Sequence, residues 1–419
     1  TNSANIRLEG IEVRRASDRA FDLQLLARNI ELLNCVGHGG GIGAYLQQVT
    51  NVIIRNCVFW QNTNNAVFVG SQVGALLENS ILGSTSANMA LYSIAPPASG
   101  FSANYNGLHA GPDTRVGVNR STSALADNLA AWQALSGGLD ARSVPGDPRM
   151  ADPDQYDYHL KTQETLGRTL PNGQFTADSV SSPLLDAGNP SSTAWTNEPG
   201  ANGGRINIGR FGGTREASIA PTMPWLQAVS FADAGGVSDG PVPLNWIAGG
   251  GWSNQTAKVE VSLDGGNTWG TTVTSGVPIT NGLAVWTLAG LPDTPAAAWR
   301  VVCLENTNSM AQSTNFFAIR NASLNVYVAT ADTNANVYCP VPGWATNWMA
   351  TASAPLDSLR TVFERFDLEP GDRIWVDSGT YAQSDALVIG MKNSGTAANP
   401  VRVTGNTNAP FQGTVLARV

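Results

Sequence analysis

The sequence predicts an all-β protein that is built on a parallel β-solenoid, or β-helix, and carries a separate β-sandwich module. The solenoid prediction rests on residues 5–92, which contain four imperfect copies of one pattern, each about one coil long. A second strand follows each copy, and a fixed spacing of 23 residues separates its members Ala20, Gly43, Ala66 and Met89. The sandwich prediction rests on short alternating strands between residues 225 and 322.

The residues of each copy alternate between apolar and mixed positions, which is the pattern of strands with one buried face. Strands this short cannot bury that face alone, but stacked coils share one continuous interior. Aligned copies therefore form two apolar columns, of which the first holds Ile6, Ile30, Val52 and Ala75 and the second holds Leu8, Leu32, Ile54 and Leu77.

A polar column follows these two. It contains Asn34, Asn56 and Asn79, with Gly10 at the same place in the first copy. Inward asparagines at the turns of stacked strands can bond to their copies above and below. We therefore expect an asparagine ladder in this column.

The four copies resemble secreted right-handed parallel β-helix repeat proteins, the pectate-lyase-like group. The resemblance implies a right-handed solenoid and a secreted, bacterial origin. It implies little about function, because the same solenoid carries lyases, hydrolases, adhesins and purely structural fibres.

Four cysteines in 419 residues do not make a disulfide framework. Cys35 and Cys57 are neighbours in one column, where we expect a stacked pair of small buried side chains; a disulfide between the coils is the alternative. Cys303 and Cys339 could pair across a domain junction. Their redox state stays open at this point.

Composition and motifs exclude several kinds of partner. Only 13% of the residues are charged, the net charge is −8 and the pI is about 4.9, so the chain lacks the basic face that nucleic acid requires. No apolar run approaches the roughly 20 residues that span a bilayer. The chain also contains no metal-ligand spacing, nucleophile elbow or phosphate loop, so we expect no cofactor and no metal.

The regular period fades after Pro96. Phe101–Leu108 is expected to form one more, irregular coil. A short helix is predicted over Ser123–Leu135, because its apolar residues fall at helical spacings and Gly137 would end it.

An ordered series of short motifs then runs to Ser218. It consists of Gly138–Ser143, Gly146–Pro148, Tyr158–Leu160, Ser182–Gly188 and Asn202–Thr214. The series is similar to the C-terminal end of many bacterial β-helix repeat proteins, where it finishes and caps the solenoid. We expect Asp140, Asp186 and Arg205 to be capping and turn residues rather than catalysts.

The stretch from Trp225 to Ala322 resembles an immunoglobulin-like or fibronectin-type-III-like module. Its residues Ser262, Asp264, Gly266, Thr268 and Trp269 match the Asp-box pattern of sialidases. One copy alone does not make a sialidase propeller. We therefore expect the motif to shape a hairpin turn, with the tryptophan packed beneath it.

The sequence pattern changes again from Leu324, where the alternating strands of the sandwich end. An amphipathic helix is predicted over Pro355–Phe366, followed by a Pro-Gly-Asp turn and strands. This order resembles the beginning of a β-helix protein. We predict three domains: 1–220, the C-terminal part and cap of a β-helix; 221–322, the sandwich; and 323–419, the first coils of the next β-helix.

The order of these parts suggests assembly. The last strand would lead naturally into the first, so the chain is expected to be a repeat unit that joins its copies head to tail, either within one polypeptide or between subunits. The expected product is a structural fibre or adhesin stalk outside the cell or at its surface. The predicted junction residues are Thr1, Asn2, Ile6, Leu8, Val415, Leu416 and Val419.

The alternative function is a polysaccharide lyase or glycoside hydrolase, which needs converging charged side chains on neighbouring coils. Asp18, Arg15 and His38 are the candidates for catalysis. A third possibility is carbohydrate binding without catalysis, with a stacking platform drawn from Tyr45, Phe59, Trp60 and Phe68. Extracellular polysaccharide is the expected partner in both cases.

Overall fold

The structure of the chain is a computed structural model. It describes residues 3–87, 89–94, 100–170, 172–200, 202–221, 223–237, 241–252, 254–288, 290–383, 386–390, 393–406 and 414–418. The chain divides into two compact units, each described by itself below. The first comprises Thr1–Ser230 with Asn245–Gln255, and the second comprises Phe231–Leu244 with Thr256–Val419. The predicted boundaries at residues 220 and 322 stay a prediction.

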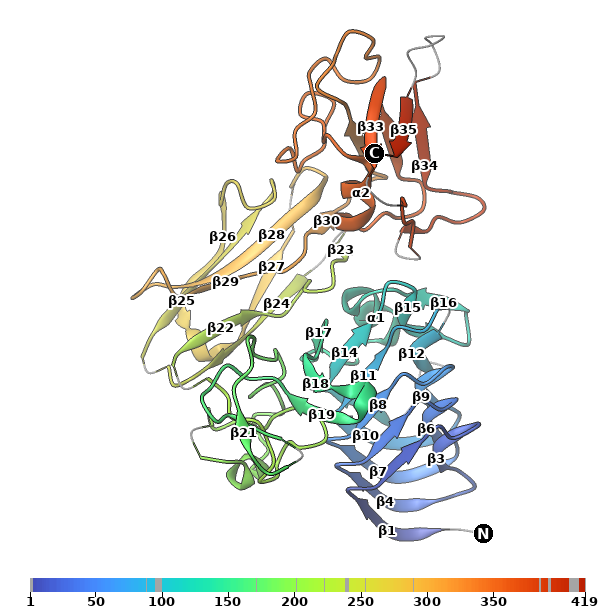
Figure 1. Ribbon diagram of the computed structural model, residues 1–419, viewed down its shortest axis with the longest axis vertical. Helices are drawn as coiled ribbons and strands as arrows, with labels where there is room; N and C mark the ends of the chain where they lie inside the picture. Colours follow the sequence, from blue (N-terminus) through green and yellow to red (C-terminus); the bar gives the residue numbers. More distant parts are fainter. Residues whose placement is uncertain are drawn as a thin grey trace. The chain divides into compact units, whose positions relative to one another are not determined.

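The first unit contains a parallel β-solenoid with three strands in each coil (Figure 1). Stacking the coils produces three sheets, here called A, B and C. Sheet A contains β1 (Ala4–Glu9), β4 (Arg28–Leu33), β7 (Val49–Arg55), β10 (Val73–Glu78) and β13 (Phe101–Asn104). Sheet B contains β2 (Glu12–Arg14), β5 (Val36–His38), β8 (Val58–Trp60), β11 (Ile81–Ser84), β14 (Gly107–Ala110) and β17 (Val144–Pro145). Sheet C contains β3 (Arg19–Leu23), β6 (Ile42–Leu46), β9 (Asn65–Val69), β12 (Met89–Ile94), β15 (Thr114–Asn119) and β16 (Ala124–Ala126).

The register of sheet A confirms both predicted apolar columns. Ile6 pairs with Ile30 and Leu8 with Leu32, and both columns continue through β7 and β10. The coil that contains Phe101 is regular, since it supplies one strand to each sheet. In sheet C the predicted column is wrong at one place: Leu91, not Met89, stands next to Ala66. The chain takes two more residues from Gly83 to Ala90 than between their register partners Trp60 and Asn65.

Residues with a left-handed backbone turn the chain at the corners between sheets. Gly10, Asn34, Asn56 and Asn79 hold the first corner, with φ values of 68°, 54°, 51° and 52°. Glycine and asparagine tolerate this conformation better than other residues. The predicted polar column is therefore a column of corner residues.

The predicted helix near residue 130 begins later than expected. Helix α1 spans Leu129–Ser136, because the side chain of Asn128 caps it by accepting from the backbone N–H of Ala131 at 2.9 Å. Residues 124–126, which fit helical spacing, instead form β16, the only antiparallel neighbour in sheet C of the described chain. Gly137 ends the helix in a left-handed conformation, as predicted.

The outer face of sheet B is covered by the segment that follows α1. Two apolar cores result: one inside the coils, and a second in which Val36, Val58 and Ile81 pack against Tyr158 and Leu184. This segment contains the short elements β18 (Met150–Asp152), η1 (Pro153–Gln155), β19 (Asp157–Leu160), β20 (Arg168–Thr169), β21 (Phe175–Thr176) and η2 (Ala194–Asn197). After it, β22 (Trp225–Ala228) pairs antiparallel with residues 246–249 of β24 (Pro241–Gly249).

Two of the three residues predicted to hold turns, Asp140 and Arg205, make hydrogen bonds that fix the local backbone. Asp140 is fully buried and accepts hydrogen bonds from Asn106 Nδ2 at 3.0 Å, Trp132 Nε1 at 3.1 Å and Ser143 Oγ at 2.6 Å. Arg205 donates to the carbonyl oxygens of residues 187 and 188.

The second unit contains the main sheet of the β-sandwich, whose strands pair antiparallel except for β23, which pairs parallel with β30. Its main sheet has the order β23, β30, β28, β25, β26. The strands are β23 (Gly236–Val237), β25 (Thr256–Ser262), β26 (Thr271–Pro278), β27 (Leu283–Thr287), β28 (Thr294–Cys303), β29 (Met310–Gln312) and β30 (Phe317–Ile319), and η3 (Ile279–Asn281) precedes β27. Trp286 of β27 packs edge-on against Phe317 of the main sheet, with 6.2 Å between ring centroids.

The Asp-box residues form the hairpin turn between β25 and β26, as predicted. Asp264 accepts from the backbone N–H and the hydroxyl of Thr268 at 2.8 and 2.7 Å, and the hydroxyl of Ser262 donates to it at 2.7 Å. Arg300 lies over the ring of Trp269, 4.3 Å from its centroid.

The second unit also contains the predicted parallel strands and helix. Sheet order is β31 (Asn325–Val328), β32 (Arg373–Val376) and β34 (Arg402–Gly405), while β33 (Gly379–Gln383) pairs with β35 (Thr414–Arg418). Helix α2 spans Leu359–Arg365 and not Pro355–Phe366, because Ser358 caps it. Its predicted apolar face is buried against these strands.

All four cysteines are buried and unpaired. Cys35 and Cys57 have no exposed surface, which confirms the stacked pair.

Candidate functional site

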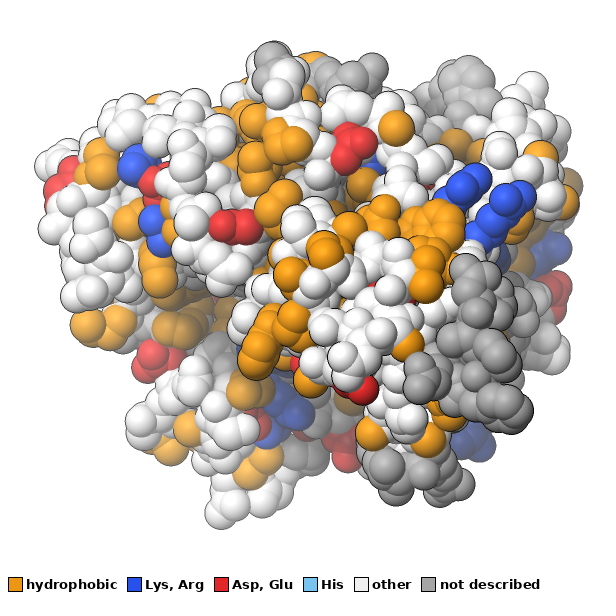
Figure 2. All heavy atoms as spheres, turned by 90° about the horizontal axis from the view of Figure 1, so that it is seen from above, with side chains coloured by type: hydrophobic (Ala, Val, Ile, Leu, Met, Phe, Trp, Pro, Cys, Tyr) orange, Lys and Arg blue, Asp and Glu red, His pale blue; other side chains and the backbone are white. Residues whose placement is uncertain are grey.

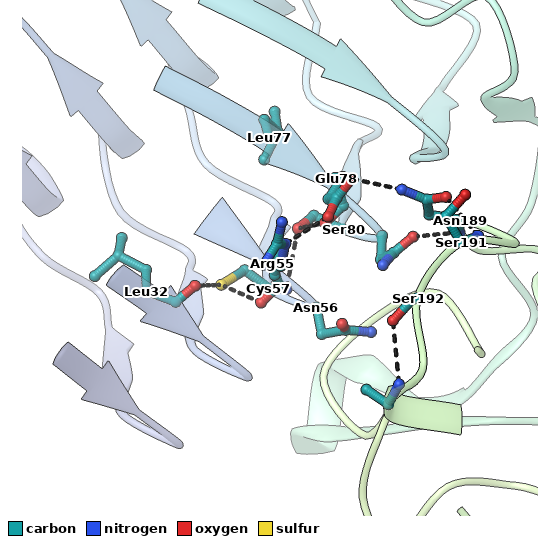
Figure 3. A network of polar contacts seen from close by, with 12 residues as sticks. Leu32, Arg55, Asn56, Cys57, Leu77, Glu78, Ser80, Asn189, Ser191 and Ser192 are labelled. Atoms are coloured by element: carbon teal, nitrogen blue, oxygen red, sulfur yellow. Dashed lines mark hydrogen bonds and ion pairs between the residues drawn. The ribbon is translucent and has the colours of Figure 1, made fainter. Parts of the chain in front are cut away.

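A groove of about 560 Å³ in the first unit brings together polar residues of the solenoid and of the segment 189–213, here called the tail. Figure 3 shows Asn189, Ser191 and Ser192 of the tail facing Asn56 and Glu78 of the coils. The solenoid contributes Arg7, Glu9, Leu33, Asn34, Arg55, Asn56, Glu78 and Asn79, and the tail side contributes Asn189, Ser191, Ser192, Thr193, Ala194, Asn197, Ile206, Gly212 and Gly213.

The last residues of four neighbouring strands of sheet A form one wall of the groove. Glu9, Leu33, Arg55 and Glu78 stand in one register column. The left-handed residue that follows each of them turns the chain toward sheet B. The corner geometry therefore repeats the same position on every coil, and the sequence decides which chemical group occupies it.

An ion pair between neighbouring coils organises this wall. The Glu78 side chain is only 9% exposed and bonds to the guanidinium of Arg55, which is 42% exposed. Its second oxygen accepts from Asn189 Nδ2 at 3.0 Å (Figure 3). A buried carboxylate needs such partners, since burying an unpaired charge is costly.

The asparagines of the first corner hold the tail and do not form the predicted ladder. Asn34 Nδ2 donates to the carbonyl oxygens of Arg210 and Gly212 at 2.5 and 3.0 Å. Asn56 Nδ2 donates to those of Asn207 and Gly209 at 3.0 and 3.2 Å. The ladder prediction is wrong here because the tail offers backbone carbonyls that the side chains bind instead.

A ladder does exist in another column, at the start of the strands. Asn29 Nδ2 donates to Asn5 Oδ1 at 2.8 Å, and Asn51 Nδ2 donates to Asn29 Oδ1 at 2.9 Å. Each amide thus donates toward the preceding coil. The Nδ2 group of Asn5 donates to no residue in the described part of the chain.

The groove offers no converging pair of acids among the described residues that line it. Glu9 and Glu78 are three coils apart in their column, or about 14 Å at the usual strand spacing. Glycosidase carboxyl pairs stand about 5–9.5 Å apart. Each of these carboxylates also has an arginine partner. The groove can therefore hold a polar ligand by hydrogen bonds, but its geometry does not fit paired acid–base hydrolysis.

The predicted catalytic candidates lie on other parts of the coils. Arg15 is a corner residue with a φ of 52°, and its backbone N–H donates to the carbonyl of His38 at 2.8 Å. Asp18 is exposed and pairs with Arg19 at 3.3 Å. No hydrogen bond or ion pair joins the side chains of Arg15, Asp18 and His38 in the described residues, so their proposed joint role stays a prediction.

His38 instead belongs to a polar cluster beneath two tyrosines. Its Nδ1 lies 2.8 Å from the hydroxyl oxygen of Tyr158, and that hydroxyl donates to Glu12 Oε1 at 3.3 Å. Arg14 and Arg210 donate to Glu12 at 2.6 and 2.5 Å. The ring of Tyr156 packs edge-on against His38 at 5.1 Å.

Burial and neighbouring charges shift the pKa values of His38 and Glu12 in this cluster. Burial lowers the pKa of His38 from its usual value, which favours the neutral ring. Burial alone would raise the pKa of Glu12, but the hydrogen bonds from Arg14 and Arg210 outweigh it and lower that pKa. The cluster therefore contains a carboxylate and a neutral imidazole that meet at one phenol.

The aromatic side chains do not supply an open stacking platform. Phe59 and Trp60 are buried. Tyr45 and Phe68 stack on each other at 4.6 Å, with Arg19 over the first ring at 3.6 Å and Arg120 over the second at 4.1 Å. The strand order from β3 to β15 places the two arginines at opposite ends of this stack, so each ring face already has a neighbour.

The described junction residues lie on terminal coils. Ile6 is 40% exposed, and Leu8 is partly buried. Val415 and Leu416 are 48% and 47% exposed. Thr1, Asn2 and Val419 lie outside the described residues.

Sequence reasoning missed three residues of the first coil. Ile11, Leu25 and Leu26 are 45%, 58% and 57% exposed. The available signal was a pair of leucines at a corner where the next two coils carry polar residues, with Gln48 and Gln72 in the left-handed conformation.

Among the described residues, no group of three or more histidine, cysteine, aspartate or glutamate side chains is placed to hold a metal ion. None of the described helices has the length and hydropathy of a membrane span. The chain matches no protein-family model, no curated protein and no solved structure.

Proposed function

We propose that the chain is a structural repeat unit of an extracellular fibre or cell-surface stalk, whose copies join head to tail through the ends of the β-solenoid. The observation that carries the proposal is the exposure of interior columns at both terminal coils. In a solenoid each coil buries its face only against its neighbours. A terminal coil with exposed interior positions is therefore a surface for another coil.

The first coil carries one such surface. Ile6 is 40% exposed, whereas Ile30 and Val52 in the same column are 3% and 1% exposed. Ile11, Leu25 and Leu26 add exposed apolar area on this coil. Its outer edge is also the end of the asparagine ladder, where the Nδ2 donor of Asn5 is available to a further coil.

The parallel strands of the second unit carry the other surface. Val403 of β34 is 46% exposed, whereas Val326 and Ile374 in the same column are fully buried. Leu416 of β35 is 47% exposed, whereas its register partner Tyr381 is buried. Fully burying an exposed side chain of this kind contributes about 1.5–3 kcal/mol, and a half-exposed one gains about half of that, so several at each end favour association.

A second copy of the chain is the occupant that fits both surfaces. The two ends present parallel strands of the same kind, with apolar residues at alternate positions. A contact between unlike ends does not close on itself, so it generates a filament. The low charge of the chain agrees with stacking of copies, and on the face shown in Figure 2 acidic and basic side chains form only small scattered groups.

The groove favours a second candidate function, binding of a neutral polysaccharide. Amide and hydroxyl groups of Asn189, Ser191, Ser192, Thr193 and Asn197 line it. A glycan array probed with the purified chain tests this function. Binding that is lost in both Asn189→Ala and Arg55→Gln would support polysaccharide binding in the groove. If the chain binds no glycan on the array, this function is ruled out.

The assembly proposal is tested by light scattering of the purified chain over a range of concentrations. We expect masses far above 43.9 kDa and filaments in negative-stain images. Ile6→Lys and Leu416→Lys each place a charge on one terminal coil and should abolish filaments. Val285→Lys is the matched control, because Val285 is a 56% exposed apolar residue on β27 of the sandwich.

Monomers at every concentration would overturn the proposal, as would equal loss of filaments in the control variant. The intact mass of the native material then shows whether neighbouring units are separate subunits or parts of one polypeptide. A mass of 43.9 kDa indicates assembled subunits, and a much larger mass indicates one continuous polypeptide.

A further inference from the structure

Two arginines of the second unit stand side by side on the outer face of the short parallel sheet. Arg373 of β32 and Arg402 of β34 are register partners. Neighbouring strands lie about 4.8 Å apart, so two positive charges share one small patch. Like charges directly opposite each other on a sheet are destabilising. This pair therefore calls for a compensating negative charge.

The described residues supply no such charge. Neither Arg373 nor Arg402 has a carboxylate within ion-pair distance in the described part of the chain, although many of the other arginines do. The carboxylate of Asp372, next in sequence, is fully buried and is held by Arg320 at 2.7 Å and by the backbone N–H groups of Leu324 and Glu369. These contacts occupy the Asp372 carboxylate, so it does not neutralise Arg373 or Arg402.

The two arginines line a polar pocket of about 460 Å³. Its lining contains no acidic residue and consists of Ala322, Ser323, Leu324, Asn325, Gly371, Arg373, Ala398, Asn399, Pro400 and Arg402. Asn325 continues the arginine column on β31, and its Oδ1 accepts from Trp375 Nε1 at 3.0 Å. That bond leaves the Nδ2 group of Asn325 as a further donor beside the guanidinium groups.

We propose that this pocket, here called the arginine pocket, is a binding site for a doubly charged tetrahedral oxyanion of the phosphate or sulfate type. Guanidinium groups bind such oxyanions through paired, charge-assisted hydrogen bonds. Two arginines on adjacent strands can address different oxygens of one anion, and Ser323 and Asn325 add neutral donors. Bound anion would also relieve the repulsion between the two side chains.

Isothermal titration with inorganic phosphate at slightly alkaline pH tests this site, with ionic strength held constant by sodium chloride. We expect one saturable site, weakened by about tenfold or more in Arg373→Gln and in Arg402→Gln. Arg28→Gln is the control, because Arg28 is an exposed arginine on β4 of the other unit. Thermal melts of each variant verify that the fold is retained.

Parallel titrations with methyl phosphate separate the two sources of the anion. Binding of both compounds indicates that a phosphate ester on a larger molecule can occupy the pocket, and binding of inorganic phosphate alone indicates a free ion. Absence of saturable binding to either compound would overturn the proposal. So would binding that survives in both arginine variants or that is lost equally in Arg28→Gln.

Discussion

At the scale of single residues, two buried carboxyl groups shape the tail. Asp186 Oδ2 accepts from the backbone N–H of Gly203 at 2.7 Å. Glu198 Oε1 accepts from those of Asn207 and Gly213 at 2.9 and 2.7 Å. Burial raises the pKa of Asp186 to about 6 and that of Glu198 to about 7, and the negative charge of Asp186 adds to the effect on Glu198. The second oxygen of each carboxyl has no hydrogen-bond partner among the residues that the structure describes.

These raised pKa values predict a pH-dependent stability. A carboxyl whose pKa is higher in the folded state binds its proton more tightly there. The stabilisation is complete below the unfolded pKa, near 4, and is lost as pH rises through about 6 to 7. We expect the free energy of unfolding of the first unit to fall across this window, by on the order of 3 kcal/mol for each carboxyl.

Urea unfolding followed by tryptophan fluorescence between pH 4 and about pH 8 measures this slope. Asp186→Asn and Glu198→Gln should each flatten it, because the replaced groups no longer titrate. Asp113→Asn removes an exposed carboxyl and should leave the slope unchanged. A slope that both buried variants retain would show that other groups cause the pH dependence.

At the scale of elements, the first corner of the solenoid and the tail depend on each other. Asn56 contributes two hydrogen bonds to the tail and Asn34 contributes two more, while Asn79 Oδ1 accepts from the backbone N–H of Asn189 at 2.7 Å. The corner conformation requires a residue that tolerates positive φ, and asparagine also carries the donor that the tail needs. One residue type thus serves both the turn and the docking.

Removing these donors should loosen the tail. Asn56→Ala removes a donor from the carbonyl oxygens of Asn207 and Gly209, of which the second keeps the backbone N–H of Gly212. We expect a loss of about 1–3 kcal/mol. Asn56→Asp should cost more, because a carboxylate would face those same carbonyls. Limited proteolysis within residues 189–213 is expected to speed up in both variants. Asn64→Ala, at an exposed asparagine, is the control. Equal cleavage rates in all variants would show that the hydrogen bonds of Asn56 do not hold the tail.

The helices illustrate why element boundaries were harder to predict than element types. The predicted apolar face of α2 is buried, but the helix begins at Leu359 because Ser358 supplies the cap. Residues 124–126 fit a helix equally well, yet they pair with β15. These residues form a strand and not a helix because the folded solenoid offers them the free edge of β15 as a pairing partner.

At the scale of the whole molecule, assembly through unlike ends makes a specific prediction about mixtures. Ile6→Lys leaves the end in the second unit intact, and Leu416→Lys leaves the first coil intact. Each variant alone should be monomeric, and an equal mixture should form dimers of twice 43.9 kDa and nothing larger. Analytical ultracentrifugation measures these masses.

Pairing between like ends would give a different result. Each variant would then dimerise alone through its intact end, and mixing would add no new species. A mixture that stays monomeric would instead mean that the two ends do not recognise each other. Val285→Lys again serves as the control for the added charge.

The sequence by itself determined the solenoid, because every coil repeats the same inward positions and the period is visible without any partner. The sequence spacing of Ile6, Ile30 and Val52 is enough to predict that they stack in one column. It also determined the hairpin at Asp264 and the apolar face of α2, whose signals lie within a few residues.

Only the tertiary structure decided which outer faces are covered. Asn34 reaches the carbonyl of Arg210, and His38 meets Tyr158, across separations that carry no periodic signal. Arg55 and Glu78 became one wall of a groove only when the tail packed beside them. Local patterns record the repeating interior of the coils, whereas the chemistry of their outer faces depends on which distant segment docks there.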